Sequence, residues 1–202
     1  MKTPIGDNWC QNHLADQTLY RLLEKSDEDL VQLTREKGCL HCPLGKLHRA
    51  DYRRKPRGMK CWPKDPTETK RFSLCCDAEG CRRRHTPPSV RFLGRRVYAG
   101  VLVVLVSAMV HGLKAERVAC LRKALQIDRR TLERWRQWWL GLFVASSFWK
   151  GARARFLPPL CQKTLPLSLC LNFEVEQRDR LLDLLLFLAP ITTPQAWKEL
   201  VM

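Results

Sequence analysis

Apolar residues in the first part of the chain recur at helical spacing. Between residues 14 and 37 leucines recur at intervals of three and four positions, as from Leu19 to Leu22 and Leu23 and from Leu30 to Leu33, which is the spacing on one face of an α-helix. Ser26 and Asp27 interrupt this pattern with short polar side chains that favour a helix start, and Gly38 follows as a stop signal. The pattern predicts a helical segment over residues 1–38, with a second helix beginning near residue 28. We expect this segment to pack on later parts of the chain or to contact another protein.

The pattern changes between residues 39 and 93, where helical periodicity disappears. Prolines and glycines break this stretch repeatedly, and its large apolar side chains are few. A segment with so small a core usually needs a disulfide or metal staple. We therefore expect residues 39–93 to form a separate small module.

Helical patterns return after residue 94. They predict helices over residues 95–111, 115–125, 129–142, 146–155 and 174–188. Leucines make the last of these apolar on most sides, which indicates either a buried helix or an association surface. The chain then divides into an N-terminal helical segment (1–38), a basic module (39–93), a helical domain (94–157) and a leucine-rich C-terminal part (158–202).

One apolar stretch is long enough that a transmembrane helix has to be considered. Residues 97–113 hold no Lys, Arg, Asp or Glu over seventeen positions. A transmembrane helix needs about 20 apolar residues, and this stretch also contains Ser107 and His111. A buried helix, with no membrane partner, is the simpler interpretation.

The charge of the chain is strongly positive. Lys and Arg total 36 against 20 Asp and Glu, giving a net charge of +16 and a pI near 9.8. Residues 46–96 alone hold sixteen Lys and Arg against five Asp and Glu. Such a concentrated excess favours a polyanionic partner such as DNA, RNA or an anionic membrane surface.

The ten cysteines include pairs at the spacing of metal ligands rather than being spread evenly along the chain. The first residues lack the apolar run of a secretory signal, so we expect a reducing, cytoplasmic environment in which the cysteines bind a metal. The pairs that carry this prediction are Cys39 with Cys42 and Cys76 with Cys81. A C-x2-C pair and a C-x4-C pair, the second with Gly80 in its turn, supply the four thiolates of a tetrahedral Zn²⁺ site.

The fourth ligand remains open at the level of sequence. Cys42 and Cys76 are separated by 33 residues, more than the roughly 15–20 usual between such pairs, and an inserted basic loop over residues 46–70 would explain the gap. The candidates that compete with Cys76 are Cys75, Cys61, His41, His48 and His85. The remaining cysteines are interpreted as small core residues: Cys10, Cys120, Cys161 and Cys170.

Residues 116–135 follow the pattern of a helix-turn-helix. Val118, Leu121 and Leu125 would line the first helix, Ile127 would plug the core at the turn, and Asp128 would cap the second helix. The expected fold class is therefore mainly α, with a small zinc-ribbon-like β element and a helix-turn-helix (homeodomain-like) bundle.

The second of these helices would be the recognition helix. The pattern predicts that Leu132 and Trp135 face inward. The side chains that would then face outward and contact DNA are Arg129, Arg130, Thr131 and Arg134. Phosphate contacts are assigned to Arg82, Arg83 and Arg84. The following aromatic residues are interpreted as core rather than as a base-stacking platform: Trp138, Trp139, Phe143, Phe148 and Trp149.

These motifs resemble the N-terminal part of some bacterial insertion-sequence transposases. Residues 71–86 look like the second knuckle of their zinc ribbon, with an aromatic residue before the cysteines and Arg-Arg and Thr after the last one. Cys39 and Cys42 match the first knuckle, and residues 128–135 match the helix-turn-helix that follows. The resemblance covers roughly residues 39–140.

The catalytic part of such a transposase has no counterpart in this sequence. Three carboxylates that hold two metal ions are required for strand transfer, and most of the acidic residues after Trp139 fall on one helix. We therefore expect a non-enzymatic, zinc-dependent protein that binds double-stranded DNA: a nucleoid-associated accessory protein of a mobile element, or a regulator. The alternatives are a protein-interaction adaptor that uses the ribbon and the C-terminal helix, with a homodimer as one form of that contact, and a remnant transposase.

Overall fold

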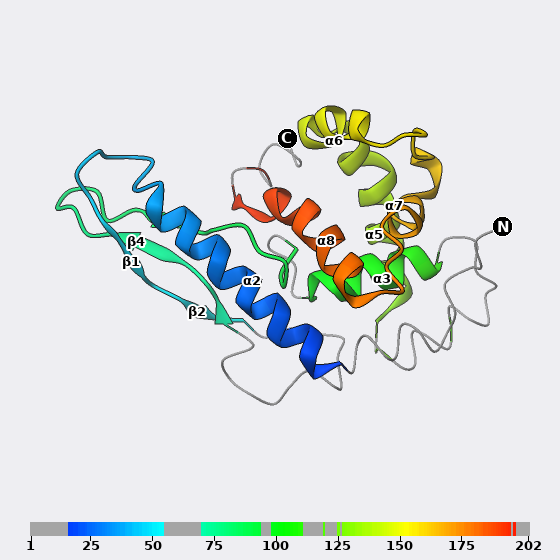
Figure 1. Ribbon diagram of the computed structural model, residues 1–202, viewed down its shortest axis with the longest axis horizontal. Helices are drawn as coiled ribbons and strands as arrows, with labels where there is room; N and C mark the ends of the chain where they lie inside the picture. Colours follow the sequence, from blue (N-terminus) through cyan, green and yellow to red (C-terminus); the bar gives the residue numbers. More distant parts are fainter. Residues whose placement is uncertain are drawn as a thin grey trace.

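The protein is mainly helical and carries two small antiparallel sheets at one end (Figure 1). The computed structural model describes residues 16–54, 70–93, 98–110 and 127–194, together with Ala119, Leu125 and Ala196. Several predictions lie outside these residues: most of the helix over 115–125, most of the basic loop, and Cys10, Cys61 and Cys120.

The described elements follow one another along the chain. They are α2 (Gln17–Glu36), β1 (Leu47–Arg49), β2 (Tyr52–Arg53), β3 (Lys70–Arg71), β4 (Leu74–Cys76), β5 (Arg84–His85), α3 (Gly100–Val110), α5 (Arg129–Gln137), η1 (Trp138–Phe143), α6 (Ser147–Ala152), η2 (Arg153–Arg155), η3 (Gln162–Thr164), α7 (Leu167–Asn172), α8 (Arg178–Leu188) and η4 (Ala189–Thr192).

The strands form the β element that the sequence predicts. β4 lies between β1 and β5 in an antiparallel sheet, and β2 pairs with β3 in a second one. In the first sheet Leu47 lies opposite Cys76, and Cys75 lies opposite both His48 and Arg84. Because neighbouring residues of a strand point to opposite faces, Cys75 and Cys76 face opposite sides of this sheet. We call strands β1 to β5 and their connecting turns the ribbon.

Helix α2 is one continuous helix, so the predicted second helix start at Ser26 and Asp27 is wrong. The cap lies earlier: the Asp16 carboxylate accepts from the amides of Thr18 at 2.9 Å and Leu19 at 3.2 Å. These bonds, together with Arg178 at 2.8 Å, outweigh burial and lower the pKa of Asp16. Arg178 begins α8, so the same carboxylate joins the first turns of two helices.

Helix α2 contributes to two separate apolar cores. Near its start, Leu19, Tyr20 and Leu23 pack into the large core of the helical part. Near its end, Val31 packs with four residues of the ribbon in a much smaller core: Leu47, Phe72, Leu74 and Cys76. Figure 1 shows α2 lying across the sheet and extending toward α8. The helix therefore links the ribbon to the helical part.

A buried polar network fixes this link at the middle of α2. Asp27, only 1% exposed, accepts from the Ser89 hydroxyl and the Val90 amide, each at 2.7 Å. The Arg91 Nε donates to the same carboxylate at 2.9 Å. The amide of Ser89 in turn donates to the Thr192 hydroxyl at 2.8 Å. One carboxylate thus ties α2 to the segment after β5, and through it to η4.

Helix α3 lies at the centre of the helical part. Its residues from 101 to 106 are at most 1% exposed, which confirms the prediction of a buried helix. No described helix has the length and apolarity needed to cross a membrane.

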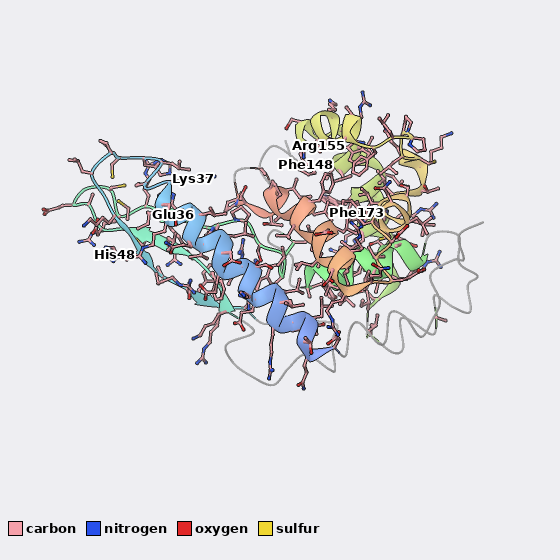
Figure 2. All side chains as sticks on the ribbon, viewed as in Figure 1. Glu36, Lys37, His48, Phe148, Arg155 and Phe173 are labelled. Carbon is pink, nitrogen blue, oxygen red and sulfur yellow. The ribbon has the colours of Figure 1, made fainter. Side chains whose placement is uncertain are left out.

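The predicted aromatic core is also confirmed. Trp138 is 3% exposed, Trp149 is 1% exposed, and Trp139 and Phe143 are fully buried. The half-buried Phe148 contacts Phe143 and Phe187 within the aromatic cluster labelled in part in Figure 2.

The C-terminal part has one more helix than the sequence predicts. α7 is short and its apolar positions give no clear period, and α8 begins at Arg178 rather than near residue 174. Four leucines of α8 are at most 3% exposed: Leu181, Leu184, Leu185 and Leu188. These four leucines confirm that the helix is largely buried, whereas Leu186 is 38% exposed, so an association surface on this helix stays a prediction.

The Asp27 network gives a direct stability prediction. Asp27→Ala removes the buried carboxylate that accepts from Arg91, Ser89 and Val90, so the free energy of unfolding should fall by about 3–5 kcal/mol. Urea unfolding of the metal-loaded protein measures this change. Asp29→Ala, at an exposed position of the same helix, is the matched control and should change stability by less than about 0.5 kcal/mol. Equal effects of the two substitutions would contradict the role of Asp27 in linking α2 to the segment after β5.

Candidate metal centre

Four cysteines come together at the free end of the ribbon. Cys39 and Cys42 lie in the loop between α2 and β1, Cys76 ends β4, and Cys81 lies in the turn before β5. Their sulfur atoms are all within 4.8 Å of one another. The structure therefore assembles the predicted ligand set from three separate segments, and this set could hold a metal ion.

The distances between the sulfur atoms suit a tetrahedral centre. Cys39 Sγ lies 3.8 Å from Cys81 Sγ, and Cys42 Sγ lies 3.5 Å from Cys76 Sγ. Four thiolates at the zinc–sulfur bond length of about 2.3 Å stand about 3.8 Å apart at the corners of a tetrahedron. All four positions would be filled by protein sulfur, so such a centre leaves no site open for a substrate.

Three glycines shape the two cysteine turns. Gly38 and Gly80 have φ angles of +73° and +81°, values that glycine adopts without strain. Gly45 has a different role, because a Cβ added there would overlap Cys76 Sγ and come within 3.0 Å of Cys42 Sγ. The chain after the first cysteine pair therefore has to pass against the cluster without a side chain.

The structure separates Cys76 from its rival Cys75. The Cys75 thiol points away from the cluster and donates to the Arg82 carbonyl at 3.4 Å. His48 is also directed elsewhere, with its Nε2 at 2.8 Å from the Asp77 carboxylate. Neither side chain belongs to the four-sulfur group.

His85 is the predicted alternative that comes nearest. Its Nε2 lies 3.3 Å from Cys39 Sγ, and the residue is only 4% exposed. Its ring is 5.3 Å from that of His41, whose Nδ1 contacts the Arg83 guanidinium at 3.2 Å. His85 is therefore placed to donate to the Cys39 sulfur from outside the four-cysteine group, as residues surrounding metal ligands commonly do.

The thiols of the cluster differ in acidity. Burial raises the pKa of Cys76 to about 12, helped by the neighbouring thiols of Cys42, Cys39 and Cys81. Burial also acts to raise the pKa of Cys39, but hydrogen bonds from the His41 and Cys42 amides and from His85 lower it to about 6. Cys39 is thus ready to ionise, whereas Cys76 needs a bound cation to become a thiolate.

The three arginines after Cys81 have different surroundings. Arg82 and Arg83 are exposed, and Arg82 has a φ of +43° in the turn. The Arg84 guanidinium instead donates to the Ala50 carbonyl at 2.6 Å and to the Ser73 hydroxyl at 3.1 Å. Arg84 is exposed as well, but these two bonds tie its guanidinium to the sheet, so Arg82 and Arg83 are the two arginines beside the cluster that we consider for contacts with a partner.

The start of α5 matches the sequence prediction closely. Ile127 is 2% exposed and Trp135 is 2% exposed, so both occupy the core as expected. The Asp128 side chain caps the helix by accepting from the Thr131 amide at 2.8 Å. This bond and one from the Thr131 hydroxyl lower the pKa of Asp128.

The prediction that Thr131 faces outward is wrong. Thr131 is 2% exposed because its hydroxyl donates to Asp128 at 3.1 Å and accepts from Arg134 at 2.9 Å. Arg129 and Arg130 are exposed as predicted, although Arg129 also pairs with Glu133 at 2.7 Å.

The predicted DNA-binding residues form two groups rather than one. Arg82 and Arg83 lie on the ribbon, whereas Arg129, Arg130 and Arg134 lie on α5, in the other half of the molecule (Figure 1). Leu125 packs partly buried on the helical core, but the helix expected before α5 lies largely outside the described residues. The structure therefore does not confirm a helix-turn-helix.

Sequence reasoning misses two features of the cluster. In the sequence Gly45 is indistinguishable from an ordinary turn glycine. Its position three residues after Cys42 is the one indication that it could contact the sulfur atoms. The exposure of Leu40 and Leu44, at 73% and 89%, has no local signal because apolar residues are expected to be buried.

Comparisons of the chain with protein-family models, with curated proteins and with solved structures find no match.

The adjacent pair Cys75 and Cys76 offers a sharp test of the ligand set. Cys76→Ser should abolish stoichiometric metal binding, because it removes one of four ligands and a member of the small ribbon core. Cys75→Ser should leave it unchanged, since that thiol faces the opposite side of the sheet. Elemental analysis of the two purified proteins, beside the unsubstituted chain, measures the metal content. A metal-free Cys75→Ser protein with a metal-loaded Cys76→Ser protein would refute the assignment.

A second prediction concerns Gly45. Gly45→Ala should weaken metal binding roughly 10–100-fold, as disruption around metal ligands commonly does, because the added methyl group displaces Cys76 and Cys42. Gly151→Ala is the matched control, since nothing lies within 4 Å of the Cβ it would add. Competition with a chromophoric chelator measures both affinities, and equal values for the two variants would show that Gly45 is not packed against the cluster.

Proposed function

We propose that this chain is a zinc-dependent DNA-binding protein without catalytic activity, acting as an accessory protein of a mobile element or as a transcriptional regulator. The observation that carries the proposal is the four-cysteine cluster with two exposed arginines, Arg82 and Arg83, directly after one of its members. In this arrangement the metal would fix the backbone from which the arginines reach the phosphates.

Zinc is the ion that best suits an all-cysteine set. It accepts four thiolates in a tetrahedron and undergoes no redox change. A closed centre of this kind stabilises a fold rather than activating a substrate. The ribbon core is small, so the free energy of metal binding would supply much of its stability.

DNA is the partner that the charge supports. The net charge of +16 favours a polyanion, and phosphate contacts from arginine release condensed counterions. The exposed Arg130 and the partly engaged Arg134 on α5 would add contacts to base edges. The resemblance of residues 39–140 to the DNA-recognition part of insertion-sequence transposases points the same way.

A protein-interaction adaptor is the second candidate, favoured by the exposed Leu40 and Leu44 at the cluster. Its predicted C-terminal surface is small, because most leucines of α8 are buried and, of the large apolar residues of this helix, only Leu186, at 38%, is exposed. Salt dependence separates the two functions, since DNA binding weakens steeply as salt rises and an apolar interface does not.

Substitution of arginines tests the proposal. Arg83→Ala should weaken binding to all duplexes alike and reduce the slope of log affinity against log salt by roughly 0.9. Arg130→Ala and Arg134→Ala should instead reduce the preference for a duplex selected from a random pool over an unselected one, by about 1–3 kcal/mol for a lost base contact. Fluorescence anisotropy at several salt concentrations measures both quantities.

The control for these variants is Arg155→Ala. Arg155 is exposed and lies beside α6 in the helical part, away from the ribbon (Figure 2). Arg155→Ala removes the same charge as the other substitutions and should change the affinity for DNA less than any of them. If Arg83→Ala, Arg130→Ala and Arg155→Ala all bind as the unsubstituted chain does, neither arginine group forms a DNA surface.

A further inference from the structure

Two leucines project from the first cysteine turn into solvent. Leu40 is 73% exposed and Leu44 is 89% exposed, whereas Leu47, at the start of β1, is 2% exposed. They lie on either side of Cys42, so a bound metal would anchor the backbone that carries both. Other exposed leucines occur in the chain, such as Leu157 at 87%, but Leu40 and Leu44 stand as a pair on one cysteine turn.

The turn that carries them is held firmly. The His41 amide donates to Cys39 Sγ at 3.4 Å, and the Lys46 amide donates to the Asp77 carboxylate at 2.8 Å. The Cys42 and Cys76 sulfur atoms lie 3.5 Å apart. Both leucines are therefore presented from a preorganised backbone, which lowers the entropy lost when they are buried in a partner.

The surroundings of the leucines are cationic. Arg83 contacts His41, next to Leu40, at 3.2 Å. Arg82 directly precedes Arg83, and the exposed Lys46 follows Leu44 by two residues. Lys37 lies at the end of α2, where Figure 2 labels it beside Glu36. In Figure 1 the two cysteine turns form the end of the molecule farthest from the helical part. The leucines thus stand on a protruding, basic tip rather than in a groove.

We propose that Leu40 and Leu44 form a wedge that enters the minor groove of duplex DNA and partly unstacks one base step, while Arg82 and Arg83 bind the flanking phosphates. Apolar side chains inserted between base steps bend the duplex by roughly 20–90° and are accompanied by basic residues in several architectural proteins. This proposal rests on the proposed DNA-binding function and assigns its mode of contact.

DNA fits this tip better than a protein partner does. Protein–protein interfaces are depleted of lysine, whereas at this tip Lys46 is exposed two residues after Leu44. Two leucines on a narrow protruding turn also offer little area for a stable protein interface. A minor groove needs the opposite: a thin apolar insertion with cations at its edges.

The test uses the full zinc-loaded chain and AT-rich duplexes of about 30 base pairs, long enough for the bend of roughly 20–90° to be followed. The duplexes carry 2-aminopurine at successive steps and a fluorophore pair at their ends. The unsubstituted protein should raise 2-aminopurine fluorescence and shorten the end-to-end distance. Leu40→Ala and Leu44→Ala should each lose most of both signals while keeping their zinc. Leu157→Ala is the matched control, because Leu157 is 87% exposed in the helical part, and it should retain both signals.

The outcomes separate this proposal from the proposed function. Duplex binding by the unsubstituted chain without unstacking or bending overturns the wedge and leaves DNA binding intact. No duplex binding even at low salt overturns both. Retained signals in Leu40→Ala and Leu44→Ala, or equal losses in Leu157→Ala, also overturn the wedge. The wedge is also overturned if Leu40→Ala and Leu44→Ala abolish self-association in sedimentation while the DNA signals stay unchanged. That result would assign the leucines to a protein contact.

Discussion

The four cysteine sulfurs within 4.8 Å of one another are the constraint on which the ribbon depends. So many thiols cannot ionise together at this distance without a cation, and Cys76, the most buried of them, resists ionisation most strongly. A metal ion would resolve this conflict and join the loop after α2 to both ends of the β4–β5 turn. In the proposed function, the cysteine turns would thereby become rigid enough to present Leu40 and Leu44 from one turn and Arg82 and Arg83 from the other.

The ribbon is joined to the rest of the chain by α2. The helix gives Val31 to the small core beside the cysteines and Leu19, Tyr20 and Leu23 to the large helical core. Between these contacts, Asp27 receives hydrogen bonds from the segment that leaves the ribbon. Helix α2 therefore holds the basic cysteine turns at one end of the molecule, and the helical part carries a second basic element, α5. This arrangement suits the proposed function, in which the chain would contact DNA at more than one place.

The sequence predicts local features well and long-range ones poorly. The cysteine spacing identifies Cys39, Cys42 and Cys81 and favours Cys76 as the fourth member of the group, and the structure brings these four together. Asp128 is recognisable as a cap because its partner, Thr131, is three residues away. Asp27 looks like another cap, yet it bonds Arg91 across 64 positions, and no local pattern carries that information. The burial of Thr131 is an exception among the local features. Its hydroxyl bonds Asp128 and Arg134, each three residues away, and a count of helical positions does not include such side-chain bonds.

The central claim is that a metal held by the four cysteines organises a DNA-binding tip. It is tested most directly by titrating Zn²⁺ into the metal-free chain and following thiolate absorbance and duplex affinity in the same samples. We expect both to rise together and to saturate at one Zn²⁺ per chain, and we expect a chelator to reverse both. Duplex affinity that is already complete in the metal-free chain, or that stays absent after the cysteines have bound zinc, would contradict the claim.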